Sequence, residues 1–320
     1  MQPSEDKLLH SRTAITSGAK EVLNLIAIIY KLAPIENLQP IQEGYEDANY
    51  LLTTQSGKFV VKFFAKDKTE ESITSYVSAL IEGKKIGVPL VNLRVSNTGY
   101  VAEVEDTKII VMDYFDGNNF STHDPTLGEI KSVSRFLSLF NTLNFPVSES
   151  YDSWGNNNLL VEWAANNRKL SHQTRIKVKK VVSEISNINL SGMKKGVIHA
   201  DTQKKHVLKN ARGKYCLIDL GCMRNDYLVY EISTFIAWFC LSEDNRTQWD
   251  DIFNLVVKIY KERHALKNLE ILVIKPLIRA SFAAYLLKTD HLIMGGDDSP
   301  ETKDWNNKAR GLLKLSMGWK

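Results

Sequence analysis

The sequence predicts an α+β protein in which a small β-rich part precedes a larger, mainly helical part. Two pairs of alternating apolar segments, at residues 48–64 and 99–115, predict antiparallel hairpins. An amphipathic helical pattern at residues 69–89 separates the two pairs. After residue 120 the apolar residues recur mostly at helical spacing, which predicts a helical second part.

The predicted elements follow in order along the chain. Residues 1–33 are expected to form a helical extension, because apolar residues recur at helical spacing before Pro34. Residues 34–116 are expected to form the sheet and its helix, and residues 117–320 the helical part, since the segment FDGNN at 115–119 breaks the strand pattern. Within the helical part, the patterns predict helices at residues 127–143, 172–190, 229–241, 249–264 and 277–293, and a hairpin within 197–220.

The charge balance restricts the class of partner. The formal net charge is +4 and the isoelectric point is near 8.7. This mildly basic balance suits an anionic small ligand such as a nucleotide and lacks the concentrated basic stripe of a nucleic-acid binder. We therefore expect a small-molecule partner and no nucleic acid.

Cysteine usage and hydropathy indicate a cytoplasmic protein. The three cysteines, Cys216, Cys222 and Cys240, form no C-x-x-C pair, so a disulfide framework or a zinc site is not expected. The first ten residues contain acids and no apolar core, which argues against a signal peptide. The longest apolar stretches, at 23–30 and 235–241, are too short to span a bilayer, so no membrane partner is expected.

A group of ionisable residues lies in the stretch VIHADTQKKHVLKNARGKYCLIDLGC, residues 197–222. Asp201 follows one short apolar run, Asp219 follows another, and a hairpin between them is expected to bring the two carboxylates together. His206 lies between them in sequence. Phosphoryl transfer from a nucleotide needs one carboxylate to orient or deprotonate the attacking hydroxyl and further ligands for a metal on the phosphates. The stretch predicts such a site.

The pattern resembles the aminoglycoside-phosphotransferase-like kinases, which share the bilobal protein-kinase fold and carry H-G-D-x-x-x-x-N followed by I-D-[FWL]. Within them the chain is most similar to homoserine kinase of the kinase-fold type, which writes the loop as H-A-D, here His199-Ala200-Asp201. The similarity includes the Tyr230-Glu231 segment and spans roughly residues 35–290. It implies a small β-rich N-lobe, a larger helical C-lobe, ATP or another NTP, and Mg²⁺ with Mn²⁺ as the alternative.

The resemblance also implies roles in the helical part. Asp201 would be the catalytic base or the residue that orients the hydroxyl, and Asp219 and His206 would hold the metal. His199 would brace the loop through hydrogen bonds. Glu231 would lie in the first turn of the next helix. In one departure from the family, Thr202-Gln203-Lys204-Lys205 replaces the usual leucine-rich start of the loop. The two lysines, expected near the γ-phosphate, would help to neutralise developing charge.

In the β-rich part, the resemblance implies nucleotide contacts. Lys62 would contact the α- and β-phosphates and be held by an acid of the following helix, with Glu71 preferred over Glu70. The turn Gly44–Asn49 would cover the phosphates. Backbone groups of Asp113 to Phe115 would bond the edge of the base.

Two further departures from the family pattern affect the functional prediction. His206 stands where the family usually has Asn, although macrolide phosphotransferases are similar in having His there, and Lys62 is often absent from homoserine kinases. The expected function is a kinase that phosphorylates a hydroxyl of a small molecule. A homoserine-like amino alcohol is the first choice, with amino sugars, choline-like alcohols and antibiotics as others. The alternative is a catalytically impaired pseudokinase that binds nucleotide and regulates a partner.

Overall fold

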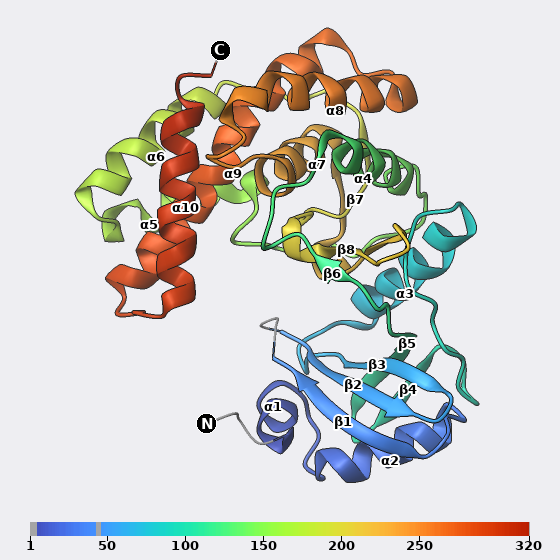
Figure 1. The fold of residues 1–320 in the computed structure, drawn as a ribbon. Coiled ribbons are helices and arrows are strands. Elements are labelled where there is room, and N and C mark those ends of the chain that lie inside the picture. Colours follow the sequence, from blue (N-terminus) through green and yellow to red (C-terminus); the bar gives the residue numbers. More distant parts are fainter. Residues whose placement is uncertain (1–4, 43–45, 320) are drawn as a thin grey trace. The chain divides into compact units, whose positions relative to one another are not determined.

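The computed structural model describes residues 5–42 and 46–319. The chain forms two compact units. One consists of Met1–Gly117 with Lys209–Leu217, and the other of Asn118–Leu208 with Ile218–Lys320. Figure 1 shows the sheet in the first unit and most of the helices in the second. This distribution confirms the α+β class.

The first unit is built on an antiparallel sheet of five strands in the order β1-β2-β3-β5-β4. Both hairpins and the helix expected from the sequence are present. The described elements of this unit are α1 (Glu5–Arg12), α2 (Ala19–Ile29), β1 (Ile35–Ile41), β2 (Ala48–Thr54), β3 (Gly57–Phe63), α3 (Glu70–Lys85), β4 (Val101–Val104), β5 (Thr107–Asp113) and β9 (Tyr215–Leu217).

One face of this sheet is covered by α1 and α2 (Figure 1). The core there joins Leu9 and Leu23 of the helices to Tyr50, Val61 and other strand residues, all fully buried. Because side chains alternate along a strand, the residue after Val61 points to the opposite face. The sheet therefore presents Lys62 on the face that α1 and α2 do not cover.

Strand β1 was not expected from the sequence, because Pro40 lies within it. Proline has no N–H to give to a ladder, so it argues against a central strand. The structure resolves the conflict by placing β1 at the edge of the sheet, where only β2 is its neighbour. Strands with proline are tolerated at such an edge.

The second unit is mainly helical and carries short strands around the Asp201 loop. Its five expected helices are present, while α5, α10, β6 and β10 were not expected. The described elements are β6 (Asn118–Asn119), α4 (Leu127–Phe140), α5 (Leu159–Asn166), α6 (His172–Ile185), β7 (Lys195–Ile198), β8 (Val207–Lys209), β10 (Arg224–Tyr227), α7 (Leu228–Phe235), α8 (Trp249–His264), α9 (Asn268–Met294) and α10 (Pro300–Ser316).

The helices of this unit pack around a core of large aromatic side chains. Trp238, Trp249 and Phe282 are almost completely buried. Helices α9 and α10 lie side by side (Figure 1), and α7 continues into a π-helical segment at Ile236–Cys240 whose residues are all buried. None of the helices among the described residues has the length and hydropathy needed to cross a membrane.

Strand β7 leads into the Asp201 loop and is fixed on two sides. It pairs antiparallel with β10, and the side chain of Asn141, at the end of α4, donates to the Val197 carbonyl at 2.8 Å. A Cβ atom on Gly196 would lie 2.7 Å from the Asn141 carbonyl oxygen. Glycine is therefore required at 196 for β7 to approach α4 this closely, and the loop starts from a defined position.

Candidate active site

The backbone of the Asp201 loop is held by one buried carboxylate. Glu231, in the first turn of α7 and fully buried, accepts the N–H groups of His199 and Ala200 and the hydroxyl of Thr202. Burial raises the pKa of Glu231, against the lowering effect of His199 and of these hydrogen bonds. The sequence placed this acid in the first turn correctly, but its contact with the loop was not expected.

Replacing Glu231 should destabilise the protein and lower kcat. In Glu231→Gln one acceptor oxygen becomes a donor that faces the donors of the loop. Each unsatisfied buried group costs about 1–3 kcal/mol, so we expect a loss of that size in the free energy of unfolding, measured by urea denaturation. The control is Glu301→Gln, which removes an exposed first-turn acid of α10 and should cost at most about 1 kcal/mol. Equal losses of unfolding free energy in the two variants would mean that Glu231 acts only on the helix dipole and does not hold the loop.

His199 braces the loop, as expected. Its Nδ1 accepts the Asp201 N–H at 3.3 Å, so the proton lies on Nε2, which donates to the Ile218 carbonyl at 2.9 Å. His199 is completely buried. The ring therefore joins the residue before Asp219 to the loop that carries Asp201, and it is a structural residue.

The structure brings Asp201, His206 and Asp219 together. The Ile218 N–H donates to the His206 carbonyl at 3.0 Å, so the chain returns beside the loop as the hairpin prediction required. His206 Nδ1 lies 2.6 Å from the Asp201 carbonyl oxygen and 3.3 Å from Asp201 Oδ2. His206 Nε2 lies 3.3 Å from Asp219 Oδ2. Asp219 adopts a left-handed conformation with φ 64°, which asparagine and aspartate tolerate better than most residues.

His206 and Asp219 each offer one ligand atom to a cation. The Asp201 carbonyl can only accept, so His206 Nδ1 donates to it, and in the neutral ring Nε2 carries a lone pair toward the Asp219 carboxylate. Two adjacent ligands of an octahedral ion at about 2.1 Å lie about 3 Å apart, close to the separation here. The described residues include no cluster of three or more metal-ligating side chains. The pair suits an ion that takes its remaining ligands from phosphates and water.

The Asp201 carboxylate is oriented by a neighbour in its own loop. Gln203 Nε2 donates to Asp201 Oδ1 and lies 3.0 Å from the hydroxyl of Tyr285 on α9. Burial raises the pKa of Tyr285 well above its usual value, and the charge of Asp201 adds to this, so the phenol stays protonated. Neither residue was predicted from the sequence. Gln203 could have been found, because it lies two positions from Asp201, whereas Tyr285 lies 84 positions further on and no sequence pattern links it to the loop.

The two lysines of the loop have other neighbours. Lys204 Nζ lies 2.5 Å from Asp124 Oδ1, and Asp124 also accepts from the Ser242 hydroxyl. Burial alone would raise the pKa of Asp124, but the bonds from Lys204 and Ser242 lower it. Lys205 lies 6.0 Å from the centre of the Trp305 ring. Lys204 is therefore held in an ion pair with Asp124.

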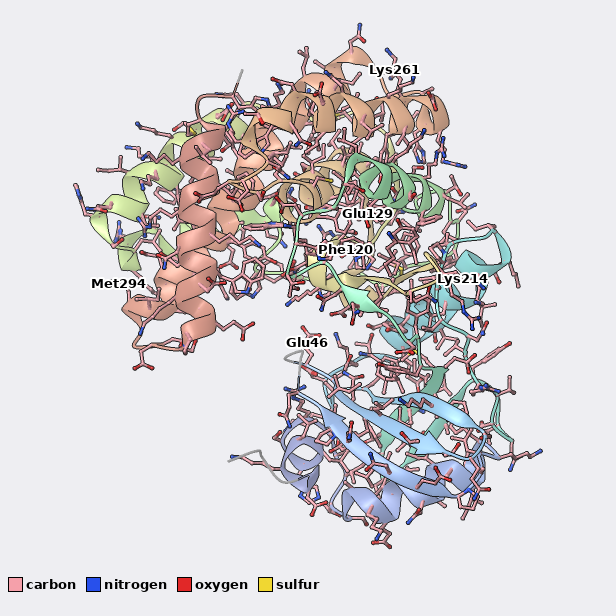
Figure 2. The ribbon with its side chains drawn as sticks, viewed as in Figure 1. Glu46, Phe120, Glu129, Lys214, Lys261 and Met294 are labelled. Carbon is pink, nitrogen blue, oxygen red and sulfur yellow. The ribbon has the colours of Figure 1, made fainter. Side chains whose placement is uncertain are left out.

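The second anchor of the loop comes from the segment after β6. The Phe120 N–H donates to the Lys204 carbonyl at 2.9 Å, and the Phe120 ring lies 5.2 Å from that of Phe239 (Figure 2 labels Phe120). Together with Glu231 and His199, this contact fixes the loop at both of its ends.

In the first unit, Lys62 is paired with an acid that differs from the expected one. Lys62 Nζ lies 2.5 Å from Asp47 Oδ2, and both side chains are less than one-tenth exposed. Helix α3 contributes the Tyr76 ring, 5.3 Å from Nζ, whereas Glu71 is exposed and Glu70 lies beside Lys108. The choice of Glu71 is thus corrected to Asp47, because the first turn of α3 leaves its acids at the surface.

Asp47 is itself fixed. Its Oδ1 accepts the Ala65 N–H at 2.9 Å, and its carbonyl accepts from Arg12 of α1 at 2.7 Å. Asn49 lies opposite Lys62 in the β2–β3 register. Gly44, the other residue expected in the phosphate-covering turn, lies outside the described residues.

The end of β5, which was expected to face the base, is held in place by hydrogen bonds to the Asp113 side chain. Asp113 binds Asn92 and Arg94 through its carboxylate, and its N–H donates to the Asn92 carbonyl at 2.9 Å. The Tyr114 N–H donates to the Lys58 carbonyl at 3.1 Å. In a strand, the N–H and C=O groups of one residue point to the same side, and those of the next residue point to the other side. The Asp113 carbonyl therefore points away from β3, as its N–H does. Phe115 lies two residues further along the chain.

The fold is that of the kinase-like phosphotransferases. The model of the phosphotransferase enzyme family matches residues 37–261, and the chain belongs to that family of small-molecule kinases. Its class is that of small-molecule phosphotransferases.

Curated relatives are similar to this chain in sequence, and solved structures are similar to it in fold. A homoserine kinase of Rhodopseudomonas palustris (strain BisA53) is 21% identical over 238 residues, covering 72% of each protein. Amicoumacin kinase hAmiN, solved in complex with AMP-PNP, Ca²⁺ and Ami, has a TM-score of 0.69 at 12% identity, and the match covers 95% of this chain and 94% of that chain. Spectinomycin phosphotransferase, solved with ADP and spectinomycin, has a TM-score of 0.64 at 13% identity, with coverage of 95% and 99%.

Proposed function

We propose that the protein transfers the terminal phosphoryl group of ATP, or of another nucleoside triphosphate, to a hydroxyl of a small amino alcohol, with homoserine as the first candidate. The meeting of Asp201, His206 and Asp219 in one place carries the proposal. The similarity to homoserine kinases supports the acceptor. Amino sugars, choline-like alcohols and antibiotics are the other acceptors to test.

Asp201 is the proposed base or orienting group for the acceptor hydroxyl. Its Oδ1 is occupied by Gln203 and its Oδ2 faces His206, so the carboxylate has a fixed direction. Positioning of this kind supplies much of the rate in phosphoryl transfer, where little covalent chemistry falls to the protein. The bridge from Gln203 to Tyr285 keeps the carboxylate in place as the hydroxyl approaches.

His206 and Asp219 are the proposed ligands of Mg²⁺, with Mn²⁺ as the alternative. A bound divalent ion would neutralise charge on the phosphate oxygens. An imidazole in place of the usual oxygen ligand favours Mn²⁺ more than an all-oxygen set would.

In the first unit, Lys62 is the proposed contact of the α- and β-phosphates, held in place by Asp47. The Asp113 carbonyl and the Phe115 N–H are the proposed partners of the base edge, since the neighbouring N–H groups of Asp113 and Tyr114 are already bonded within the sheet region.

The test is a coupled assay of ADP release with ATP and Mg²⁺ over a panel of hydroxylated metabolites. We expect acceptor-dependent ADP release and a phosphate ester of the acceptor, detected by phosphorus NMR. Metal-dependent nucleotide binding without ester formation from any acceptor would instead establish the pseudokinase alternative.

A further inference from the structure

A lysine on α10 has an ammonium group that forms no ion pair among the described residues. Lys308 is half-buried, and within the described part of the chain its Nζ takes part in no hydrogen bond or ion pair. It lies 4.9 Å from the centre of the Trp305 ring and 6.0 Å from that of Trp238. Aromatic faces attract a cation, but they satisfy none of its three N–H donors.

This lysine belongs to the same cluster of side chains as Asp201. The chain of contacts runs from Asp201 to Gln203, then to the Tyr285 hydroxyl. The Tyr285 ring lies 5.3 Å from that of Trp305, over which Lys308 is placed. All of these residues belong to the second unit.

The two lysines beside the Trp305 ring form no ion pair among the described residues. Lys205, from the Asp201 loop, lies over the same Trp305 ring and likewise has no ion pair within the described residues. Burial lowers the pKa of Lys308 and nearby Lys204 lowers it further, while Asp304 and Asp124 raise it. Asp124 is already bonded to Lys204 and Ser242, so it offers little compensation. Partly desolvated ammonium groups of this kind attract an anion.

We propose that Lys308, with Lys205, binds an anionic group of the phosphate acceptor, a carboxylate in an acceptor of homoserine size, against the ring of Trp305. This inference rests on the proposed function and deepens it, because it selects a carboxylate-bearing acceptor over cationic amino sugars and choline-like alcohols. The acceptor hydroxyl then lies at Asp201 and its anionic end at Lys308, with Tyr285 and Trp305 along the side.

Three acceptors of matched length test the contributions of the amine and of the carboxylate separately. Homoserine carries an amine and a carboxylate, γ-hydroxybutyrate lacks the amine, and aminopropanol lacks the carboxylate. For the full-length protein we expect turnover of homoserine and γ-hydroxybutyrate with lower KM than of aminopropanol. In Lys308→Gln, KM for the carboxylate acceptors should rise about tenfold to a hundredfold, because a hydrogen bond to a charged group contributes that much. KM for ATP and KM for aminopropanol should stay within about twofold of wild type.

Lys308→Arg should recover most of the affinity, and Lys303→Gln, an exposed lysine of the same helix, should change nothing. Preference for aminopropanol, or an unchanged KM for homoserine in Lys308→Gln, would overturn the proposal.

A binding measurement keeps this test separate from that of the proposed function. Titration with α-aminobutyrate, which has the carboxylate but no hydroxyl, should change tryptophan fluorescence in the wild-type protein and in Lys303→Gln, and much less in Lys308→Gln. No turnover of any acceptor, together with this Lys308-dependent binding, would reject phosphoryl transfer but support the anion site. Turnover without any dependence of carboxylate binding on Lys308 would reject the anion site alone.

Discussion

Asp201→Asn is expected to lower kcat by about a hundredfold to ten-thousandfold, the range typical of loss of a general base. Asparagine has the same shape and keeps an oxygen that can accept from Gln203, so the loop geometry should survive. It cannot take the proton of an attacking hydroxyl, and it places less negative charge beside it. The ADP-release assay with the best acceptor measures the effect, and KM for ATP should change by less than about threefold.

The control for this variant is Asp251→Asn, which removes an exposed acid of α8. Its kcat should equal that of the wild type. Thermal unfolding of both variants tests whether the fold is retained. If Asp201→Asn kept wild-type turnover while remaining folded, Asp201 would have no chemical role and the proposed mechanism would fail.

Asp219→Asn is expected to lower activity by a similar factor and to weaken the response to divalent metal. The amide keeps one oxygen but loses the negative charge, and carboxylates are the protein ligands that Mg²⁺ generally uses. We expect the Mg²⁺ concentration for half-maximal activity to rise at least about tenfold, as a loss of about 1.4 kcal/mol in binding requires. Titration of MgCl₂ and MnCl₂ at saturating ATP measures this shift.

A readout independent of turnover uses ADP binding followed by calorimetry. In the wild type, Mg²⁺ should tighten ADP binding, and in Asp219→Asn this tightening should largely disappear, while Asp251→Asn should behave as the wild type. An unchanged metal dependence in Asp219→Asn would assign the metal to other groups and leave the contact between His206 and Asp219 as a structural one.

The local features of the chain could be predicted because they depend on local spacing. Alternation of apolar residues gave the hairpins β2–β3 and β4–β5, and helical periodicity gave α3, α4 and α8. Strand β1 was missed because Pro40 overrides strand propensity except at an edge, and no sequence pattern tells which strand will be the edge.

The chemistry of the Asp201 loop was predictable for a related reason. Asp201, His206 and Asp219 lie within 19 positions of one another, and a short hairpin leaves few ways to arrange them. The anchoring of His199 followed from the same motif. The partners that give the loop its fixed geometry were less accessible, since Glu231, Tyr285 and Asp124 come from elements far apart in the chain.

The sequence by itself determined the fold class, the hairpin that unites the two aspartates, and the family. Only the tertiary structure decided which charges form ion pairs: Asp47 rather than Glu71 binds Lys62, Asp124 binds Lys204, and Lys308 has no ion pair among the described residues. The physical reason is that periodicity reports which side of an element is buried. Pairing of charges depends on distances between elements and on local burial, and these are fixed only when the elements have packed.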